Sequence, residues 1–448
     1  MRRRMNWGWL LVLPLLAIVA YIAIADPRGV KDVKVPPTVH KETQGREEVF
    51  QTEPTNERPG ELPFVPSEPV TAYVSTEGDD KASGDQEHPF RTISKAVDSG
   101  AETIFVFAGT YRESINVSRP GGKLEIVAKP LSDTQKDVVI DLGTALTMSA
   151  DATTGLLKAV HLSKAGDFIR KVFVEKTEDL VYDSKLGNYG FDFEAYACNL
   201  WRGNEKLVPV MTVEECQSKA GTWTYDGTFV YVNGEQGEYT LSDGAAEHGI
   251  CLRYLSEVKL TGITVQYARK NGVYLKGCSD GQISRCYFGY SGLNNGLALE
   301  SSSAMVRDCE AAFNRTDGFN IHGVSTADFI GCISHDNGDD GLSHHDQSGG
   351  MVIGGSYYRN VKAGIASPTF GSRNDIVGTF VYENGTGIYA VSSKDGVYPM
   401  CTVSGCLIRD NGIGIKTQRY VLDCWNNVFT GNGKNTEEQF GGQIRIYP

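Results

Sequence analysis

Residues 335–346 hold the side chains of this chain that are best suited to acid–base chemistry. Three histidines and four aspartates fall within these twelve residues. Imidazole titrates near neutral pH, so a histidine here can take up or release a proton under ordinary conditions. We therefore expect a reactive site in this segment, with His345 as a general base that Asp346 positions.

A repeat of about 23 residues must position this site. A glycine followed by an apolar residue recurs every 22 to 27 residues, at Gly249, Gly272, Gly296, Gly318, Gly341, Gly364, Gly387 and Gly414. Apolar residues alternate with other residues after each glycine, which indicates short strands. Strands repeated at this period predict an all-β fold, a parallel β-solenoid whose coils stack ~4.8 Å apart.

Two further columns share the period. Cys286, Cys309 and Cys332 are each 23 residues apart, and we expect them to point inward and pack as small apolar thiols. Asparagines recur at the same interval, at Asn314, Asn337 and Asn360. These are predicted to lie in turns and to hydrogen-bond to each other and to the backbone. Of the ten cysteines, Cys198 and Cys216 form the disulfide that we expect first.

The strand period also predicts which side chains face outward. The first and third residues after each repeat glycine should point inward, and the second and fourth outward. The fourth residues form an outward column of Arg253, Lys276, Glu300, His322 and His345. Asp317 and Asp340 precede their glycines, so acids and histidines of three successive coils should share one face.

The N-terminal part of the chain has a different character. Three arginines precede an apolar run from Trp7 to Ala25, which predicts an export element in residues 1–25, either a cleaved signal peptide or a retained membrane anchor. Residues 26–70 have the composition of a flexible linker. The folded domain should then span residues 71–448, on the periplasmic, cell-surface or secreted side of the membrane, with a small β insertion at about 165–245 where the period lapses.

The net charge narrows the class of partner. The chain has 43 basic and 55 acidic residues, for a net charge of −12. Nucleic-acid binding needs clustered lysine and arginine, so we expect no nucleic-acid partner.

Three motifs near the start of the domain carry a resemblance. Tyr73-Val74-Ser75, Pro89-Phe90-Arg91-Thr92-Ile93 and Ala108-Gly109-Thr110-Tyr111-Arg112-Glu113 look like the opening coil of secreted right-handed parallel β-helix proteins that act on polysaccharides. The resemblance, with the repeats, covers residues 72–448. It implies a right-handed parallel β-helix and an acidic polysaccharide as the partner, while the reaction stays open among lyases, epimerases, glycosidases and inactive binders.

Two patterns in the site segment refine this resemblance. Thr316-Asp317-Gly318-Phe319 and Asn337-Gly338-Asp339-Asp340-Gly341 resemble the calcium-binding coils of one branch of β-helix pectate lyases. By position, the resemblance implies Asp317, Asp339 and Asp340 as ligands of Ca²⁺, an ion that prefers such hard oxygen donors. Ser343 stands where that branch has a further acidic ligand, and Ala366 where it has its catalytic lysine.

The second pattern is Gly341-Leu342-Ser343-His344-His345-Asp346, which resembles the Asp-Pro-His-Asp signature of β-helix mannuronan C5-epimerases in His345 and Asp346. In both families the uronate carboxylate is neutralised and a base removes the C5 proton. On this hypothesis His322 is the acid or a sugar contact. The remaining candidates are the cations Lys276, Arg315 and Arg373 for the carboxylate, Tyr274 and Tyr389 for stacking on sugars, and Glu300 and Asn320 for other substrate contacts.

Two other functions remain open on the sequence. The chain is a glycoside hydrolase if Asp317, Asp339 and Asp340 supply a pair of catalytic carboxylates, since acids one coil apart fit the separations that such enzymes use. It is a non-catalytic glycan-binding envelope protein if the outward face only holds a polysaccharide.

Overall fold

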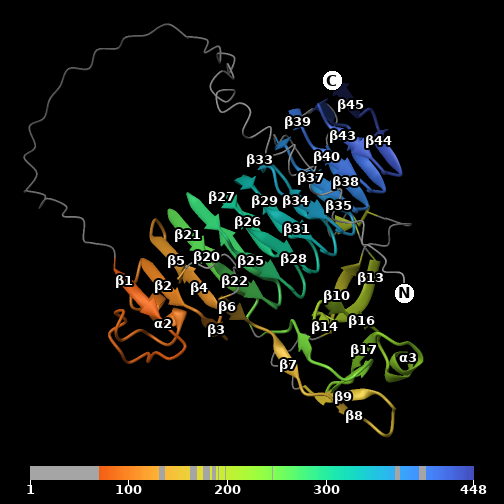
Figure 1. Cartoon of the computed structure of the whole chain (residues 1–448). Coiled ribbons are helices and arrows are strands. Elements are labelled where there is room, and N and C mark those ends of the chain that lie inside the picture. The colour runs from red at the N-terminus through yellow and green to blue at the C-terminus, as the bar shows by residue number, and fades with distance from the viewer. Residues whose placement is uncertain are drawn as a thin grey trace, which may run out of the picture. The chain divides into compact units, whose positions relative to one another are not determined.

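The structure is a computed structural model that describes residues 70–130, 137–161, 169–174, 182–183, 188–189, 191–196, 198–244, 246–368, 374–392 and 400–448 (Figure 1). The predicted export segment, all of the predicted linker except Val70, and Arg373 lie outside these residues. No helix in the described part of the chain is long and apolar enough to cross a membrane.

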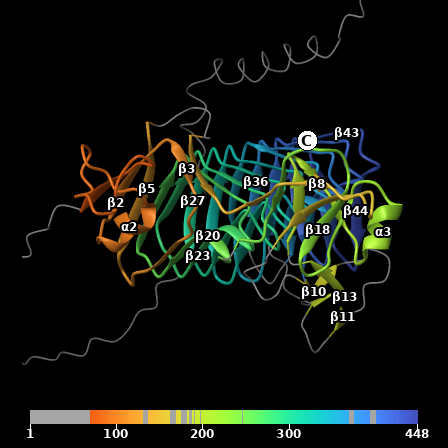
Figure 2. The same cartoon turned by 90° about the horizontal axis from the view of Figure 1, so that it is seen from below.

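Three parallel sheets form the body of the domain, and each coil of the chain adds one strand to each of them. Figure 2 shows successive coils side by side along the helix. Sheet A contains β1 (Thr71–Val74), β2 (Thr103–Phe107), β5 (Lys123–Lys129), β21 (Glu257–Thr261), β24 (Gly281–Ser284), β27 (Ser303–Arg307), β30 (Thr326–Ile330), β33 (Gly350–Ile353), β36 (Asn374–Val377), β39 (Met400–Ser404), β42 (Val421–Trp425) and β45 (Gln443–Tyr447). The predicted parallel β-solenoid is therefore confirmed.

The other two sheets have ten strands each. Sheet B contains β3 (Gly109–Tyr111), β6 (Val138–Asp141), β22 (Ile263–Gln266), β25 (Tyr287–Gly289), β28 (Glu310–Ala312), β31 (Ile333–His335), β34 (Ser356–Tyr358), β37 (Phe380–Tyr382), β40 (Leu407–Arg409) and β43 (Val428–Thr430). Sheet C contains β4 (Ile115–Ser118), β20 (His248–Arg253), β23 (Asn271–Lys276), β26 (Leu297–Glu300), β29 (Phe319–His322), β32 (Leu342–His344), β35 (Ala363–Pro368), β38 (Thr386–Val391), β41 (Ile413–Gln418) and β44 (Lys434–Gln439).

The interior follows the alternation read from the sequence. The first and third residues after the repeat glycines, such as Ile250 and Leu252, are buried in one continuous core. Cys286, Cys309 and Cys332 lie in this core as free thiols, as predicted. An apolar interior that runs through every coil means that each coil is stabilised mainly by its two neighbours.

An asparagine ladder runs along the turns between sheets B and C. Asn314 Nδ2 donates to Asn337 Oδ1 at 3.0 Å, and Asn337 Nδ2 donates to Asn360 Oδ1 at 2.9 Å. The ladder continues through Asn384, Asn411 and Asn432 with distances of 3.0 to 3.1 Å. The side-chain amides also accept backbone hydrogen bonds, since the backbone N–H of Asn314 donates to Asn337 Oδ1. This confirms the predicted role of the column.

The motifs at the start of the domain build its N-terminal cap. Helix α2 (Ile93–Asp98) buries Ile93, Ala96 and Val97 against the core at the β1 end. The Glu113 carboxylate accepts the backbone N–H groups of Ile93 and Ser94, both at 2.8 Å, and so covers free donors of the first helical turn. These motifs therefore stabilise the end of the helix rather than a reactive site.

A separate β unit is inserted between β6 and β20. Its elements are β7 (Thr144–Leu146), β8 (Ser149–Ala150), β9 (Leu157–Val160), β10 (Ile169–Val174), β11 (Tyr182–Asp183), β12 (Asn188–Tyr189), β13 (Phe191–Tyr196), β14 (Leu200–Arg202), β15 (Glu205–Lys206), β16 (Val208–Pro209), α3 (Val213–Ser218), β17 (Thr222–Tyr225), β18 (Phe229–Asn233) and β19 (Tyr239–Leu241). The inserted unit begins at β7, about twenty residues before the start predicted from the sequence. The reason is that β7 and β9 pair with β19 and β18 of this unit.

The predicted disulfide of the insertion is wrong. Cys198 and Cys216 are both free and buried. They belong to different apolar clusters: Cys198 packs with Trp223 and Leu241, whereas Cys216 packs with Leu156 and Tyr231. Each thiol therefore fills a small core of its own.

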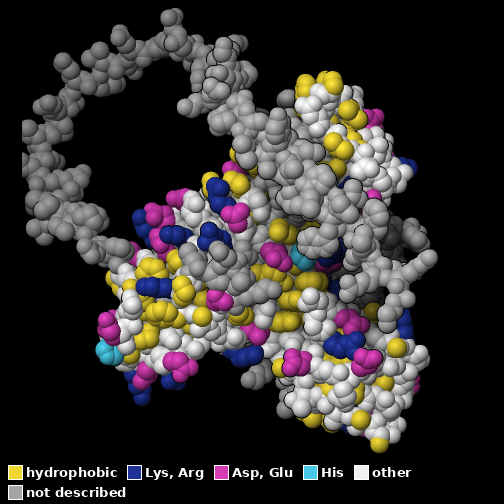
Figure 3. Space-filling model, viewed as in Figure 1, with side chains coloured by type: hydrophobic (Ala, Val, Ile, Leu, Met, Phe, Trp, Pro, Cys, Tyr) yellow, Lys and Arg dark blue, Asp and Glu magenta, His cyan; other side chains and the backbone are white. Residues whose placement is uncertain are grey.

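The last coil carries apolar side chains that reach solvent. Hydrophobic side chains gather over this end of the helix (Figure 3). Trp425, Val428, Phe440 and Ile446 are all exposed there, and the Trp425 ring stacks on Tyr447 with centroids 4.0 Å apart.

Candidate functional site

The segment 335–346 divides among four places in the fold. His335 and Asp336 lie on sheet B, where His335 Nε2 is 3.1 Å from Glu310 Oε1. Asp339 and Asp340 occupy the turn that leads into β32, and the His344 side chain is fully buried. Burial, and then the neighbouring His345, lower the pKa of His344 to about 3, so it is a neutral core residue. Only His345 and Asp346 reach the outer side of sheet C.

The outward column of sheet C is in the predicted register. Lys276 of β23 pairs with Glu300 of β26, and Glu300 pairs with His322 of β29. The His345 ring stacks on the His322 ring with centroids 4.3 Å apart and the planes 2° from parallel. Four side chains of successive coils therefore stand in one row.

The two stacked imidazoles have different partners. His322 Nδ1 lies 3.2 Å from Asp346 Oδ2, which also accepts the Gly323 N–H at 3.0 Å. His345 Nε2 lies 2.6 Å from the Ser343 hydroxyl. Asp346 has a left-handed backbone with a φ of 59°, and this turn aims its carboxylate back at the preceding coil. The structure thus pairs Asp346 with His322, whereas the sequence pairs it with His345.

The protonation states of this group follow from its surroundings. Burial, followed by the charge of His322, lowers the pKa of His345 to about 4, so His345 is neutral at neutral pH. Burial acts to raise the pKa of Asp346, but hydrogen bonds from Gly323 and His322 outweigh it and lower that pKa. Asp346 is therefore an anion beside His322.

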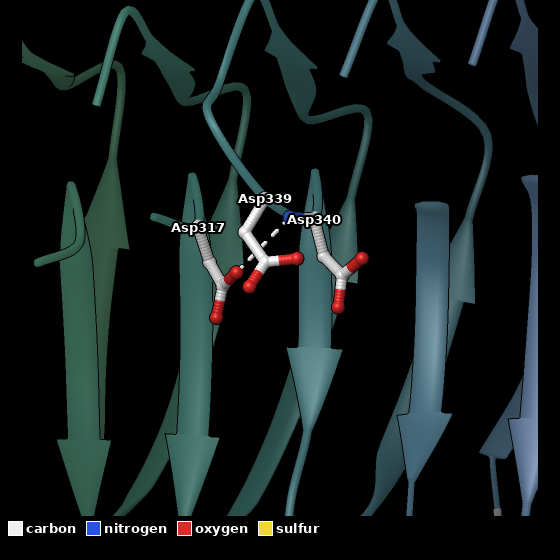
Figure 4. A group of neighbouring side chains, drawn as sticks. All are labelled: Asp317, Asp339 and Asp340. Carbon is white, nitrogen blue, oxygen red and sulfur yellow. Dashed lines mark hydrogen bonds between the residues drawn. The ribbon is translucent and has the colours of Figure 1, made fainter. Parts of the chain in front are cut away.

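Three carboxylates lie beside this pair of histidines in sequence. Asp317, Asp339 and Asp340 each place an oxygen within 4.8 Å of the others. Figure 4 shows Asp317 and Asp340 at the starts of neighbouring strands, with Asp339 beside them. The Asp340 N–H donates to Asp317 Oδ1 at 3.0 Å, and the Ala363 N–H donates to Asp340 Oδ1 at 2.9 Å.

These two bonds belong to a ladder that uses amides elsewhere. Asn271 Oδ1 accepts the Asn295 N–H, and Asn295 Oδ1 accepts the Asp317 N–H, both at 3.1 Å. Asp317 and Asp340 continue the same pattern with carboxylate oxygens. Because asparagine fills the role in the preceding coils, the ladder does not need the two negative charges. The charges therefore call for another explanation.

The carboxylate group is electrostatically unfavourable as it stands. Burial raises the pKa of Asp317 to about 6. Burial, followed by the charges of Asp340 and Asp317, raises the pKa of Asp339 to about 9, and burial and Asp317 raise that of Asp340 well above its usual value. Lys362 Nζ lies 3.1 Å from Asp339 Oδ2, but burial lowers the pKa of Lys362 itself to about 8.

The donor set fits a hard divalent cation. Asp339 Oδ1 and Asn320 Oδ1 are buried and have no hydrogen-bond partner among the residues that the structure describes, and Asn320 Nδ2 donates to Asp317 Oδ2. Oxygen atoms that converge with several negative charges are the ligands that Ca²⁺ prefers.

The other predicted residues have varied surroundings. Lys276 Nζ forms an ion pair of 2.8 Å with Glu300, which also accepts a hydrogen bond from the Tyr274 hydroxyl. Arg315 Nη1 donates to Asn199 Oδ1 of the insertion at 3.2 Å. Tyr389 lies further along sheet C, with Lys416 Nζ 5.6 Å from its ring centroid. The charge of Lys276 is thus already compensated, and Arg315 faces the insertion.

Ser343, Lys362 and Lys206 are site candidates that the sequence reading does not single out. Ser343 could have been found, because it follows Asn320 in the outward column two residues after the repeat glycine. Lys362 follows Asp339 at the 23-residue interval. Lys206 has no such signal, since it lies in the insertion, outside the repeat.

Comparison with known families identifies the fold. Residues 228–380 and 290–444 match a family described as right handed beta helix region. Residues 76–120 match a second family, described as a protein of unknown function (DUF1565), and this match covers part of the N-terminal cap. The domain is therefore a right-handed parallel β-helix. No curated protein matches the chain.

Several solved structures resemble the chain at low sequence identity. The complex structure of XylC with xylose has a TM-score of 0.49 and 12% identity, and the match covers 84% of this chain and 70% of that one. Pectate lyase Pel9A has a TM-score of 0.37 and 10% identity, with coverage of 85% and 78%. The A-module of the Azotobacter vinelandii mannuronan C-5 epimerase AlgE4 has a TM-score of 0.37 and 12% identity, with coverage of 84% and 97%. The assignment of the fold rests on the family match and the three parallel sheets.

Proposed function

We propose that this protein is a polysaccharide lyase or C5-epimerase that removes the C5 proton of a uronic-acid residue in an acidic polysaccharide. The observation that carries the proposal is the stacked pair His322 and His345, which lies in the same two coils as a group of three carboxylates. A base and a means to neutralise the uronate carboxylate are what C5 proton abstraction needs.

His345 is the base in this proposal. Its lowered pKa leaves it neutral at neutral pH, so one ring nitrogen carries a lone pair. If Nε2–H donates to the Ser343 hydroxyl, which is 2.6 Å away, the lone pair is on Nδ1. Burial keeps the pKa of Asp340 well above its usual value, and a hydrogen bond from Ser343 acts against this rise. Ser343 would then fix the reactive tautomer of His345, as a hydrogen bond to one ring nitrogen commonly does.

His322 is the acid in this proposal. The Asp346 carboxylate lies 3.2 Å from its Nδ1. In an elimination, His322 would hand its proton to the leaving oxygen. In an epimerisation, the proton would have to return to C5 from the opposite face of the sugar.

Asp317, Asp339 and Asp340 would hold Ca²⁺, with Asn320 beside them. When bound, the ion supplies positive charge that neutralises the uronate carboxylate and makes C5–H more acidic. Asp317 and Asp340 would hold the ion while keeping their hydrogen bonds to the next coil. Asp339 would offer the ion its Oδ1, which has no partner among the described residues.

The remaining candidates would bind the sugar chain on either side. Glu300, two coils before His345, contacts both Tyr274 and Lys276 of the coil before its own, and Tyr389 offers a ring two coils after His345. Arg315 would approach a substrate carboxylate from the insertion side. The acidic polysaccharide is the proposed partner, and residues 1–25 would export the protein and tether it to a membrane if they are not cleaved.

A glycoside hydrolase is the second candidate, because the carboxylates are close together. Oxygens of Asp317, Asp339 and Asp340 lie within 4.8 Å, near the separation of about 5 Å that retaining enzymes use. The raised pKa of Asp339, at about 9, would keep it protonated as a general acid.

Proton NMR with the full chain tests these readings. Alginate, polygalacturonate and glycosaminoglycans are incubated in D₂O with Ca²⁺. Vinyl signals identify a lyase, loss of the C5 proton signal identifies an epimerase, and new anomeric ends alone identify a hydrolase. We expect His345→Ala to abolish the reaction and His88→Ala, a change of an exposed histidine near the N-terminal cap, to leave it unchanged. Full activity of His345→Ala, or binding without turnover on every polymer, would exclude the proposed mechanism.

A further inference from the structure

The insertion docks on the helix through one tryptophan. Trp201 of β14 is 3% exposed, and its ring lies edge-on to Tyr290 and Phe313, with centroids 5.1 and 6.1 Å away. Asn204 Oδ1 accepts the Tyr290 hydroxyl at 2.6 Å at the same contact. The hairpin of β14 and β15 is thereby held against the turn that begins at Phe313.

The register of that hairpin directs Lys206 toward the same turn. Lys206 of β15 is the direct partner of Trp201 in the antiparallel pair. Directly opposed residues of an antiparallel pair place their side chains on the same face, about 5 Å apart. Since Trp201 faces the helix, Lys206 faces it as well. Its side chain is nevertheless exposed to solvent.

A second cation, Arg315, reaches the same part of the insertion. Arg315 Nη1 is held by Asn199 of the insertion, and Arg315 is two residues before Asp317. Although Lys206 keeps solvent-exposed surface, its position against the helix partly desolvates the ammonium group, which together with the charge of Arg315 lowers the pKa of Lys206. No aspartate or glutamate of the described residues forms an ion pair with Lys206. Two like charges held together favour an anion between them.

We propose that Lys206 and Arg315 together bind an anionic group of the glycan, so that the insertion supplies a substrate-binding residue next to the carboxylate group. The inference rests on the proposed function, because it takes the partner to be an acidic polysaccharide. A carboxylate and a sulfate ester share the chemistry that two adjacent cations recognise.

An alternative reading assigns Lys206 a purely structural part. Its aliphatic stem could cover the Trp201 ring while the amine remains in water, as long basic side chains often do. Substitution by methionine separates the two readings, because methionine keeps an apolar stem of similar length and removes only the charge.

The test compares full-chain Lys206→Met with the wild type in calorimetric titrations. The probes are a galacturonate oligosaccharide, its methyl ester and a sulfated heparin oligosaccharide. We expect Lys206→Met to weaken binding of the charged ligand about tenfold, which corresponds to about 1.4 kcal/mol. Binding of the neutral ester should not change. Lys206→Arg should keep most of the affinity, and the control Lys219→Met, at an exposed position beyond α3, should bind as the wild type does. Because heparin carries carboxylates as well as sulfates, tight binding of the galacturonate oligosaccharide shows that a carboxylate suffices, whereas binding of the heparin oligosaccharide alone shows that a sulfate is required.

Equal affinity of Lys206→Met and the wild type for both charged oligosaccharides would overturn the inference. So would a wild type that binds the neutral ester as tightly as the acid. Turnover in the NMR assay of the wild type decides the proposed function separately, so either idea can fail while the other stands. A lowered melting temperature of Lys206→Met would indicate lost packing. In that case the affinity of Lys206→Arg, which keeps the charge, would decide whether Lys206 binds the anion.

Discussion

Two histidines of one column differ in chemistry because their neighbours differ. His322 faces the carboxylate of Asp346, and His345 faces the hydroxyl of Ser343. Stacked rings 4.3 Å apart make it costly for both to be charged. The neutral His345 ring is therefore the proposed base, and His322, beside the Asp346 carboxylate, is the proposed acid.

The pH profile of kcat/KM should reflect this pair. His345 must be neutral to act as a base, and its pKa is about 4, so we expect activity to be lost as the pH falls through about 4. Burial is the main cause of the lowered pKa and His322 the second. Replacing His322 by glutamine should therefore move the pKa of His345 upward. NMR titration of the His345 ring measures this pKa in both proteins even if the variant is inactive, and an unchanged pKa would contradict the argument.

Removing one carboxylate should relieve the Asp317, Asp339 and Asp340 group. In Asp339→Asn the repulsion is weaker, so we expect the calcium-free variant to be at least as stable as the calcium-free wild type. Ca²⁺ should raise the melting temperature of the wild type and have much less effect on the variant. Thermal unfolding with Ca²⁺ and with a chelator checks this, and Asp98→Asn, at an exposed position of α2, is the control. A wild type that is indifferent to Ca²⁺ would refute the proposed cation site.

At the scale of strands and turns, the sequence determines most of what the structure contains. The 23-residue period places Lys276, Glu300 and His322 in one column because parallel strands in constant register align equivalent residues. It also predicts the asparagine ladder. The period does not predict which neighbouring group each side chain contacts. The Asp346 carboxylate, for example, reaches the preceding coil only through the left-handed turn after β32.

Asp340 has two roles that substitutions can separate. Its side chain accepts a ladder hydrogen bond, and its charge belongs to the candidate site. Asp340→Asn keeps an oxygen for the Ala363 N–H, so we expect its stability to match or exceed that of the wild type while activity is lost. Asp340→Ala loses that acceptor, and the N–H left without it should lower the free energy of unfolding by about 1–3 kcal/mol. Urea unfolding of both variants makes the comparison. Equal destabilisation by the two changes would show that the carboxylate charge itself supports the fold.

The asparagine ladder should be a main contributor to stability. Asn337→Ala removes bonds to Asn314 and Asn360 and leaves buried polar groups without partners, at an expected cost of about 2 kcal/mol or more. Asn294→Ala, in a neighbouring turn where the amide forms no such ladder, should cost less than about 0.5 kcal/mol. Urea unfolding measures both free energies, and similar values would show that the ladder contributes little.

On the scale of the whole domain, the insertion is where sequence reasoning was weakest. It has no period, and its strands pair in mixed directions, so neither its start at β7 nor the position of Lys206 follows from spacing. The wrong Cys198–Cys216 disulfide has the same origin, since two cysteines of one unpatterned segment gave no sign of belonging to separate clusters.

Loss of the Trp201 anchor should loosen the insertion from the helix. Trp201→Ala removes a buried ring from the contact with Tyr290 and Phe313, a change that typically costs 3–5 kcal/mol. We expect proteases to cleave within the insertion of the variant while the coils stay intact, and the affinity for acidic oligosaccharides to fall as in Lys206→Met. Limited proteolysis with mass spectrometry checks this. An insertion that is cleaved equally in both proteins would show that other contacts hold it.

The constant register of the three sheets has a consequence for how this molecule tolerates changes in length. A deletion or duplication of one whole coil leaves every remaining strand with a partner in the same alignment, whereas a change of a few residues inside a strand turns its apolar side chains outward. The β-helix can therefore become longer or shorter only by whole coils, each of which spans ~4.8 Å along the axis. A coil gained between β26 and β29 would move Lys276 away from His322 without altering either one's surroundings within its own coil. The distance between Lys276 and His322 could thus change through the number of coils between them, while the chemistry of each side chain stays the same.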